Sequence, residues 1–310
     1  TTCVRDAESG KNEFSEGIEY LNGVLIRRFE TDPIHAQNRT IYEKKAKFAR
    51  KLRRFLYRLR LLELFSYLFP IWTYKQKKEI QSINASQFYS STLNEFISKH
   101  KDDYKVFIAM SLDYPTFFYT VAYAGNKTIG IPTMHNASIS FRSLLTSVVS
   151  QIRYMGFNSG EELKLAKRIF GKAMRSYGII SVGIEEPIAA NWTTVRSRYM
   201  LPDEYLLYVG RITQVKLYRL LTYFQAYKEK YKKSTLKLVL VGGITIEKLN
   251  HPDIIYTGFV SDEEKMSILQ HATIVVNPSN GESLSLILLE ALKQGKPMLV
   301  NGLCKVLKEH

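Results

Sequence analysis

Two cationic side chains in the second half of the chain lie where a phosphate could be bound. Arg211 and Lys216 follow residues 205–210, a short apolar run with the character of a buried β-strand. Positive charges just beyond the end of a strand suit a bound pair of phosphates. The same pattern is typical of a solvated loop with ordinary surface cations, and the residue types alone favour that second interpretation.

Two carboxylates further along the chain have a spacing that could frame a diphosphate ligand. Glu282 and Glu290 flank the start of a helix expected over residues 283–292. In a helix their spacing is ~12 Å along the axis, close to the span from a sugar to a ribose across a diphosphate. The helix N-terminus between them would present free N–H groups to phosphates. A capping Glu282 and a surface Glu290 paired with Lys293 explain the pattern equally well.

His135 is the candidate from the first half of the chain. It follows Pro132 and an expected strand at residues 127–131, so it lies at the carboxyl end of that strand. Open parallel sheets bind their ligands at these ends. A single histidine is more often an ordinary surface or core residue, and the local sequence by itself favours that interpretation.

Short apolar runs that alternate with amphipathic stretches predict parallel β-sheets. A capping box of Ser261 and Glu264 begins one of the expected helices. Strands that alternate with helices favour an α/β fold whose sheets are covered on both faces. The pattern breaks near residue 185, which predicts two α/β domains, residues 1–185 and 186–310, with a ligand cleft between their sheets. The expected strands are residues 104–109, 127–131, 179–183, 205–210, 236–241, 254–260, 273–277 and 298–300.

The charge of the chain is concentrated in one segment. The 310 residues carry a formal net charge of +15, and residues 41–80 alone hold 12 basic and 3 acidic side chains. Such an excess narrows the partners to nucleic acid, an anionic membrane or an acidic small molecule. Two cysteines exclude a disulfide scaffold and a tetracysteine metal site. No run reaches the ~18 apolar residues of a membrane span.

Residues 44–60 combine positive charge with helical periodicity. Apolar side chains at 48, 52, 55, 56, 59 and 62 recur every three or four residues, which predicts an amphipathic helix. A basic amphipathic helix is typical of an anionic membrane interface, but a helix packed on its own domain with solvated cations fits equally well. Nucleic-acid binding is a weaker third interpretation, with Tyr42, Phe55 and Tyr57 able to stack on bases. The candidate membrane-binding residues are Lys44, Lys45, Lys47, Arg50, Lys51, Arg53, Arg54, Arg58 and Arg60.

The ordered motifs of the second half resemble those of the retaining family 4 glycosyltransferases with a GT-B fold. The two glutamates have the E-x7-E spacing of that family. The first half is similar to the acceptor domain of bacterial members, in residues 1–6, 22–24, 27–29, 157–159 and 161–162. The matching motifs of the second half are Tyr-Val-Gly-Arg-Ile (208–212) with Lys216, Leu-Val-Leu-Val-Gly (238–242), Tyr-Thr-Gly-Phe-Val-Ser-Asp-Glu-Glu-Lys (256–265), residues 277–292 and Gly-Lys-Pro (295–297).

The resemblance implies two Rossmann-like domains with parallel sheets that face each other across a cleft. Residues 1–185 would be the acceptor side and residues 186–310 the nucleotide-sugar side. It implies transfer of a hexose from a UDP- or GDP-linked sugar to a glycan or lipid-linked acceptor, in bacterial cell-envelope polysaccharide synthesis. No metal and no other cofactor would be needed, nucleic acid would not be a partner, and the enzyme would lie on the inner face of the cell membrane.

The resemblance also implies roles for individual residues. Arg211 and Lys216 would neutralise the donor diphosphate and stabilise the leaving group. Glu290 would accept hydrogen bonds from the ribose, and Glu282 would contact sugar hydroxyls without acting as a nucleophile. His135 would face the donor sugar from the other domain, which completes a catalytic set of Glu282, His135, Arg211 and Lys216. Three backbone N–H groups would lie against the sugar and phosphates, those of Leu284, Ser285 and Leu286.

The chain departs from the family pattern at several places. His135 is followed by Asn136 and Ala137, where the subgroup often has Asp and Glu. The first strand with its glycine-rich loop and the returning C-terminal helices are missing, and the chain has no initiator Met, so we expect a fragment cut at both ends. These departures keep a non-catalytic nucleotide-sugar-binding protein open as an alternative, followed by a basic RNA-binding protein.

Overall fold

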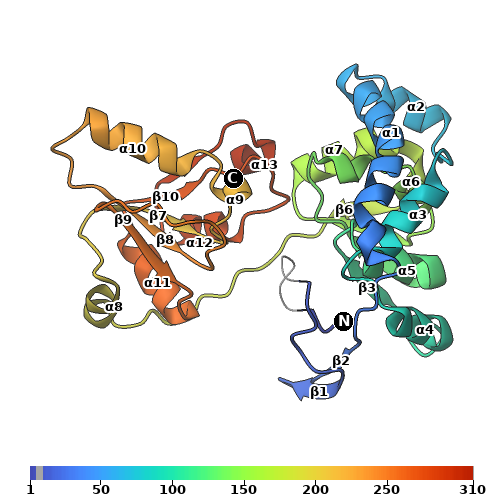
Figure 1. Cartoon of the computed structure of the whole chain (residues 1–310), viewed down its shortest axis with the longest axis horizontal. Coiled ribbons are helices and arrows are strands. Elements are labelled where there is room, and N and C mark those ends of the chain that lie inside the picture. Colours follow the sequence, from blue (N-terminus) through green and yellow to red (C-terminus); the bar gives the residue numbers. More distant parts are fainter. Residues whose placement is uncertain (5–9, 310) are drawn as a thin grey trace. The chain divides into compact units, whose positions relative to one another are not determined.

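The computed structural model describes residues 1–4 and 10–309, which divide into two compact units. Unit 1 is Thr1–Ser181 and unit 2 is Val182–His310, whereas the sequence placed the boundary after residue 185. Arg5 and Asp6, which belong to the amino-terminal motif, lie outside the described residues, as does His310. Each unit contains one parallel sheet with helices packed against it (Figure 1).

Unit 1 is built on a four-stranded parallel sheet. Its strands β3 (Phe107–Met110), β4 (Thr128–Ile131), β5 (Tyr154–Phe157) and β6 (Tyr177–Ile179) are neighbours in the order of the chain. The sequence did not predict β5, and it placed β6 at 179–183, whereas the structure ends this strand at Ile179. The helices of unit 1 are α1 (Arg39–Arg58), α2 (Leu62–Leu68), α3 (Gln76–Asn84), α4 (Ser91–His100), α5 (Pro115–Ala124), α6 (Leu144–Val149) and α7 (Gly160–Phe170).

A two-stranded antiparallel hairpin precedes these helices. It consists of β1 (Gly17–Leu21) and β2 (Val24–Arg28), which pair from Gly17 with Arg28 to Leu21 with Val24. Asn22 and Gly23 have φ angles of 51° and 78°. Positive φ at both central residues is what a two-residue type I′ turn requires, so this pair explains the hairpin.

Unit 2 is built on a five-stranded parallel sheet. Its spatial order is β11 (Met298–Val300), β10 (Ile274–Asn277), β7 (Tyr205–Val209), β8 (Lys237–Val241) and β9 (Ile254–Gly258). The capping box is present, because Ser261 and Glu264 exchange both hydrogen bonds at the start of α11. The helices are α8 (Trp192–Tyr199), α9 (Gln214–Leu217), α10 (Leu220–Lys230), α11 (Asp262–His271), α12 (Leu286–Lys293) and α13 (Lys305–Glu309).

Both faces of the unit 2 sheet are buried. Val239 and Val241 of β8 pack into one core with α8, α11, α12 and α13, while Leu238 and Leu240 pack into a second core with α10. A strand whose alternate side chains are all apolar needs cover on both faces. The expected α/β fold with two parallel sheets is therefore confirmed. No helix in the described part of the chain is both long enough and apolar enough to cross a bilayer.

Candidate functional site

The topology of unit 2 creates one position suited to a ligand. From β7 the chain passes outward through β8 and β9, then returns to place β10 on the other side of β7. At such a switch point the loops after the two neighbouring strands diverge and leave a crevice at their carboxyl ends. The loop after β7 carries Arg211 and leads into α9, which carries Lys216, and the loop after β10 carries Glu282.

A cavity of about 330 Å³ lies at this switch point, and all seven residues that the sequence predicts for donor binding line it. Three of its walls come from different segments of the chain, because the loop after β7, the loop after β10 and helix α12 contribute the lining. The complete lining is Tyr208, Val209, Gly210, Arg211, Lys216, Lys265, Asn277, Glu282, Leu284, Ser285, Leu286, Ile287 and Glu290.

The loop after β7 is shaped by close backbone contacts. Gly242 has a φ of 135°, and a Cβ atom there would lie 2.2 Å from the carbonyl oxygen of Gly210, so only glycine fits. The Tyr208 hydroxyl donates a hydrogen bond to the Arg211 carbonyl at 2.9 Å. Thr213 Oγ1 caps α9 by accepting from the Lys216 N–H at 3.1 Å. These contacts hold the loop that carries Arg211 and the short helix α9 that carries Lys216.

Each carboxylate of the cavity is paired with a lysine. Lys216 Nζ lies 2.7 Å from Glu282 Oε1, and Lys265 Nζ lies 3.1 Å from Glu290 Oε1. Burial alone would lower the pKa of Lys265, but its hydrogen bonds to Glu290 and Asp262 outweigh burial and raise it. The cavity therefore contains fixed cations and anions side by side, which suits a ligand with both phosphates and hydroxyls.

Two expectations about this segment were wrong. Glu290 pairs with Lys265 and not with Lys293, whose ammonium lies 2.7 Å from Glu186 instead. Helix α12 begins at Leu286, so Glu282 lies in a loop and the helical spacing of the two glutamates does not apply. The loop takes the place of a first helical turn because side chains at the end of β10 hold it.

Asn277 and Lys265 are site residues that the sequence analysis missed. Asn277 Nδ2 donates to Ser285 Oγ at 3.0 Å, which ties the end of β10 to the start of α12. As the last residue of an expected strand, Asn277 could have been found by the rule that ligands bind at strand ends. Lys265 ends the family-like motif at 256–265, but nothing local assigns it to the site. Its partner Glu290 is 25 residues away, and only the tertiary structure brings α11 and α12 together.

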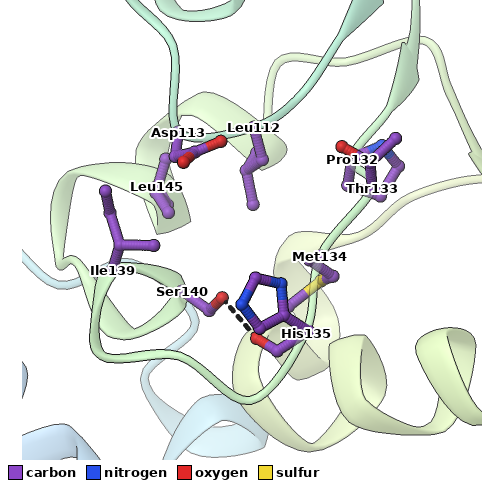
Figure 2. Close-up of a pocket in the computed structure, with 9 residues that line it drawn as sticks. All are labelled: Leu112, Asp113, Pro132, Thr133, Met134, His135, Ile139, Ser140 and Leu145. Atoms are coloured by element: carbon purple, nitrogen blue, oxygen red, sulfur yellow. Dashed lines mark hydrogen bonds between the residues drawn. The ribbon is translucent and has the colours of Figure 1, made fainter. Parts of the chain in front are cut away.

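His135 lies in unit 1, in the loop after β4. Figure 2 shows its ring beside Met134 and its carbonyl oxygen accepting a hydrogen bond from Ser140 Oγ, at 2.8 Å. The side chain is exposed at the edge of a cavity of about 20 Å³, room for one water molecule. The expectation that His135 lies at the carboxyl end of a strand is confirmed, and its place opposite a donor sugar stays a prediction.

A buried carboxylate holds the His135 loop. Glu162 at the start of α7 accepts hydrogen bonds from the N–H of Met134 at 2.6 Å and of Asn158 at 2.7 Å. It thereby joins the loop after β4 to the loop after β5. Burial raises the pKa of Glu162 to about 7, although both N–H donors favour the ionised form.

This pKa predicts a pH-dependent stability. The folded chain binds the Glu162 proton more tightly than the unfolded chain, so this contribution is present below about pH 4.5 and is lost as pH rises through about 7. We expect the free energy of unfolding of the Glu162→Gln variant to fall less than that of the wild type between pH 5 and pH 8. Urea unfolding at both pH values measures this free energy. An equal change between pH 5 and pH 8 in the two proteins would contradict the prediction.

Two of the nine residues that the sequence predicts for membrane binding, Arg50 and Arg53, have buried side chains on helix α1, so this prediction is wrong for them. Arg53 is fully buried, and it donates to the carbonyl oxygens of Arg142 and Ile169 at 2.7 Å each. Arg50 is also buried, 2.7 Å from Glu43. Arg53 faces the core because its carbonyl partners lie there, and Arg50 is buried in its ion pair with Glu43 of the same helix. Neither side chain is available to a membrane. Of the other seven, Arg54 is half-buried and the rest are exposed.

Comparisons with known proteins agree with this architecture. Residues 203–309, which include the whole cavity, match the model of the family described as Glycosyl transferases group 1. No curated protein matches the sequence. The part of unit 2 that holds the cavity is therefore similar to a Glycosyl transferases group 1 domain.

Solved structures show the fold of the whole chain. It is similar to trehalose-6-phosphate synthase OtsA (TM-score 0.60, 10% identity, 92% of this chain and 72% of that one). It is also similar to Anabaena Alr3699/HepE, solved with UDP and glucose (TM-score 0.54, 15% identity, 71% of this chain and 65% of that one). A third similar structure is sucrose-phosphate synthase from Thermosynechococcus elongatus (TM-score 0.51, 16% identity, 73% of this chain and 61% of that one). The chain therefore spans less than two thirds of the length of the HepE and sucrose-phosphate synthase chains. The fold is GT-B, with two Rossmann-like units.

Proposed function

We propose that the protein transfers a hexose, with retention and without a metal, from a UDP- or GDP-linked sugar to a glycan or lipid-linked acceptor. The reaction would take place at the cytoplasmic face of the membrane, in cell-envelope polysaccharide synthesis. One observation carries the proposal: the cavity at the switch point, within the segment that matches the Glycosyl transferases group 1 model, has three cations and two carboxylates on its wall.

The chemistry of the cavity supports a nucleotide diphosphate donor. Arg211 and Lys216 supply fixed positive charge where the diphosphate would develop negative charge as a leaving group. Glu290, on the wall formed by α12, would accept hydrogen bonds from the ribose hydroxyls. Glu282 would accept from sugar hydroxyls, and its pairing with Lys216 favours this role over that of a nucleophile.

Retention without an enzyme nucleophile requires that the acceptor attack from the side of the leaving group. In this proposal the departing phosphate takes the acceptor proton, so the chain supplies cations rather than a base. Because Arg211 and Lys216 provide the charge that a metal would otherwise provide, we expect a chelator to leave turnover unchanged. His135 would contact the donor sugar from unit 1.

Donor binding tests the proposal through Glu290. One UDP- or GDP-linked hexose should raise the melting temperature of the full-length protein and release nucleotide when acceptor is present. Glu290→Ala should weaken binding of that donor by about 10- to 100-fold, because a hydrogen bond to a charged group contributes about 1.5–3 kcal/mol. Titration calorimetry measures this, with the exposed Glu229→Ala of α10 as the matched control.

Two other results would have different meanings. If no donor raised the melting temperature and Glu290→Ala changed nothing, the proposed function would be wrong. Binding without nucleotide release would instead support a non-catalytic nucleotide-sugar-binding protein. Asn136 and Ala137 favour that second candidate, because they replace side chains that bacterial members of the resembled family often carry next to the histidine.

A further inference from the structure

Helix α1 presents an apolar face to solvent. Four apolar side chains of α1 and that of its C-cap residue Leu59 share this face, and each is 38–59% exposed. We call these five side chains the α1 apolar face. They recur at intervals of three, four and seven residues, so they form one stripe along the helix. The members of the α1 apolar face are Ile41, Phe48, Leu52, Phe55 and Leu59.

This orientation is the reverse of the usual one for an amphipathic helix. The side of α1 that packs against unit 1 carries Ala46, Ala49, Arg50 and Arg53, all of which are buried. Terminal guanidinium nitrogens of these arginines donate to Glu43 and to backbone carbonyls on this side, while the apolar stripe faces solvent and contributes little to the core. Contiguous exposed apolar surface of this kind marks an interaction site.

Further exposed apolar and aromatic side chains lie close by in the chain. Helix α2 follows α1 directly (Figure 1), and the Tyr74 ring contacts that of Phe48, with 6.3 Å between their centroids. Aromatic residues with a polar edge suit the boundary between lipid and water. The exposed residues of α2 and the segment after it include Leu64, Tyr67, Leu68, Phe69 and Ile71.

Cations border the α1 apolar face. Lys44 and Lys51 lie one turn from Phe48 on either side along the helix, and Arg58 is placed likewise beside Phe55. All three are exposed, and residues 44–60 contain no acidic side chain. A stripe of leucine and phenylalanine with basic residues at its border is complementary to acyl chains beneath anionic headgroups.

We propose that the α1 apolar face inserts into the interface of an anionic bilayer, with Lys44, Lys51 and Arg58 at the headgroups. The inference rests on the proposed function only for the membrane leaflet, because the surface lies in unit 1 and contains no donor-site residue. Lysine is depleted in the cores of protein interfaces, which argues against a protein partner. The phosphates of a nucleic acid would pair with the cations, but they would make no favourable contact with the aliphatic side chains of Ile41, Leu52 and Leu59.

Vesicle flotation with the full-length protein tests the proposal. The wild type should float with vesicles containing phosphatidylglycerol and much less with pure phosphatidylcholine. Phe48→Ser with Phe55→Ser should lower the partition coefficient at least about 10-fold, because two large apolar side chains that would be buried among the acyl chains are lost. Lys44→Gln with Lys51→Gln should lower it about 10-fold at low salt and less at high salt.

Matched variants of unit 2 separate this surface from general effects. Met200→Ser removes an apolar side chain that is 83% exposed, and Lys232→Gln with Lys233→Gln removes two exposed cations. Neither should change flotation. Trp introduced by Phe55→Trp should be quenched by brominated acyl chains, above the background of Trp72 and Trp192 in the wild type.

Several outcomes would overturn the proposal. The proposal would be wrong if the Phe48 and Phe55 substitutions left flotation unchanged. It would also be wrong if the protein bound neutral and anionic vesicles equally well. Oligonucleotide binding in place of vesicle binding, or a dimer that Phe48→Ser disrupts in the absence of lipid, would assign the surface to another partner. Loss of donor binding with intact flotation would contradict the proposed function but not this inference.

Discussion

Lys216→Ala should lower the rate of hexose transfer by about 10²–10³-fold. The ammonium would face the diphosphate as its charge grows in the transition state, and loss of one such preorganised donor typically costs about 2.7–4 kcal/mol. Its removal also leaves the half-buried Glu282 carboxylate without its partner at 2.7 Å, close to where the phosphates would lie. Steady-state kinetics at saturating donor measure the effect.

Two comparisons make this result specific. Lys232→Ala removes an exposed lysine of the same unit outside the cavity, and its kcat should stay within about 2-fold of the wild type. Lys216→Arg should retain part of the activity, because the charge is kept while its geometry changes. A Lys216→Ala enzyme with weaker donor binding but an unchanged kcat would contradict a role in leaving-group stabilisation.

Arg53→Ala should destabilise unit 1 by about 3–5 kcal/mol. The guanidinium donates to the carbonyl oxygens of Arg142 and Ile169 at 2.7 Å and lies 3.3 Å from that of Phe141. Its loss leaves the Arg142 carbonyl without this donor, while that of Ile169 keeps the hydrogen bond from Ser66 Oγ, and it opens a cavity beneath α1. These effects together reach this range. Burial lowers the pKa of Arg53 to about 10, partly offset by Glu79, so the guanidinium stays charged at neutral pH.

A neighbour on the same helix provides the control for this prediction. Lys51 is exposed, so Lys51→Ala should change the free energy of unfolding by no more than about 0.5 kcal/mol. Arg53→Lys keeps the charge but cannot reach the same carbonyls with one ammonium, and we expect an intermediate loss. Thermal and urea unfolding measure all three variants. Equal stability of the two alanine variants would show that Arg53 is dispensable.

Local sequence was sufficient for most of unit 2. The apolar runs at 205–210 and 236–241 became β7 and β8, because a nearly continuous run of apolar side chains requires cover on both faces of a sheet. The pair Ser261 and Glu264 marked the start of α11, since both of its hydrogen bonds are made within four residues. Weaker runs failed, as β5 shows: its four residues include Gly156 and give little strand signal.

For the cavity at the switch point, the charged residues proposed for donor binding were predictable, but their ion pairs were not. Arg211, Lys216, Glu282 and Glu290 could be selected by residue type, order and family resemblance. Their surroundings could not, because Lys265 meets Glu290 only through the packing of α11 beside α12.

Helix α1 shows most clearly what sequence determines and what tertiary structure decides. The periodicity of residues 44–60 determined a helix with one apolar and one basic side, since that depends only on 3.6 residues per turn. It did not determine which side is buried. The buried side is determined by hydrogen-bond acceptors on distant segments, the carbonyls of Phe141, Arg142 and Ile169. Because Arg53 donates to them, it is a core residue, and Phe48 is left in solvent.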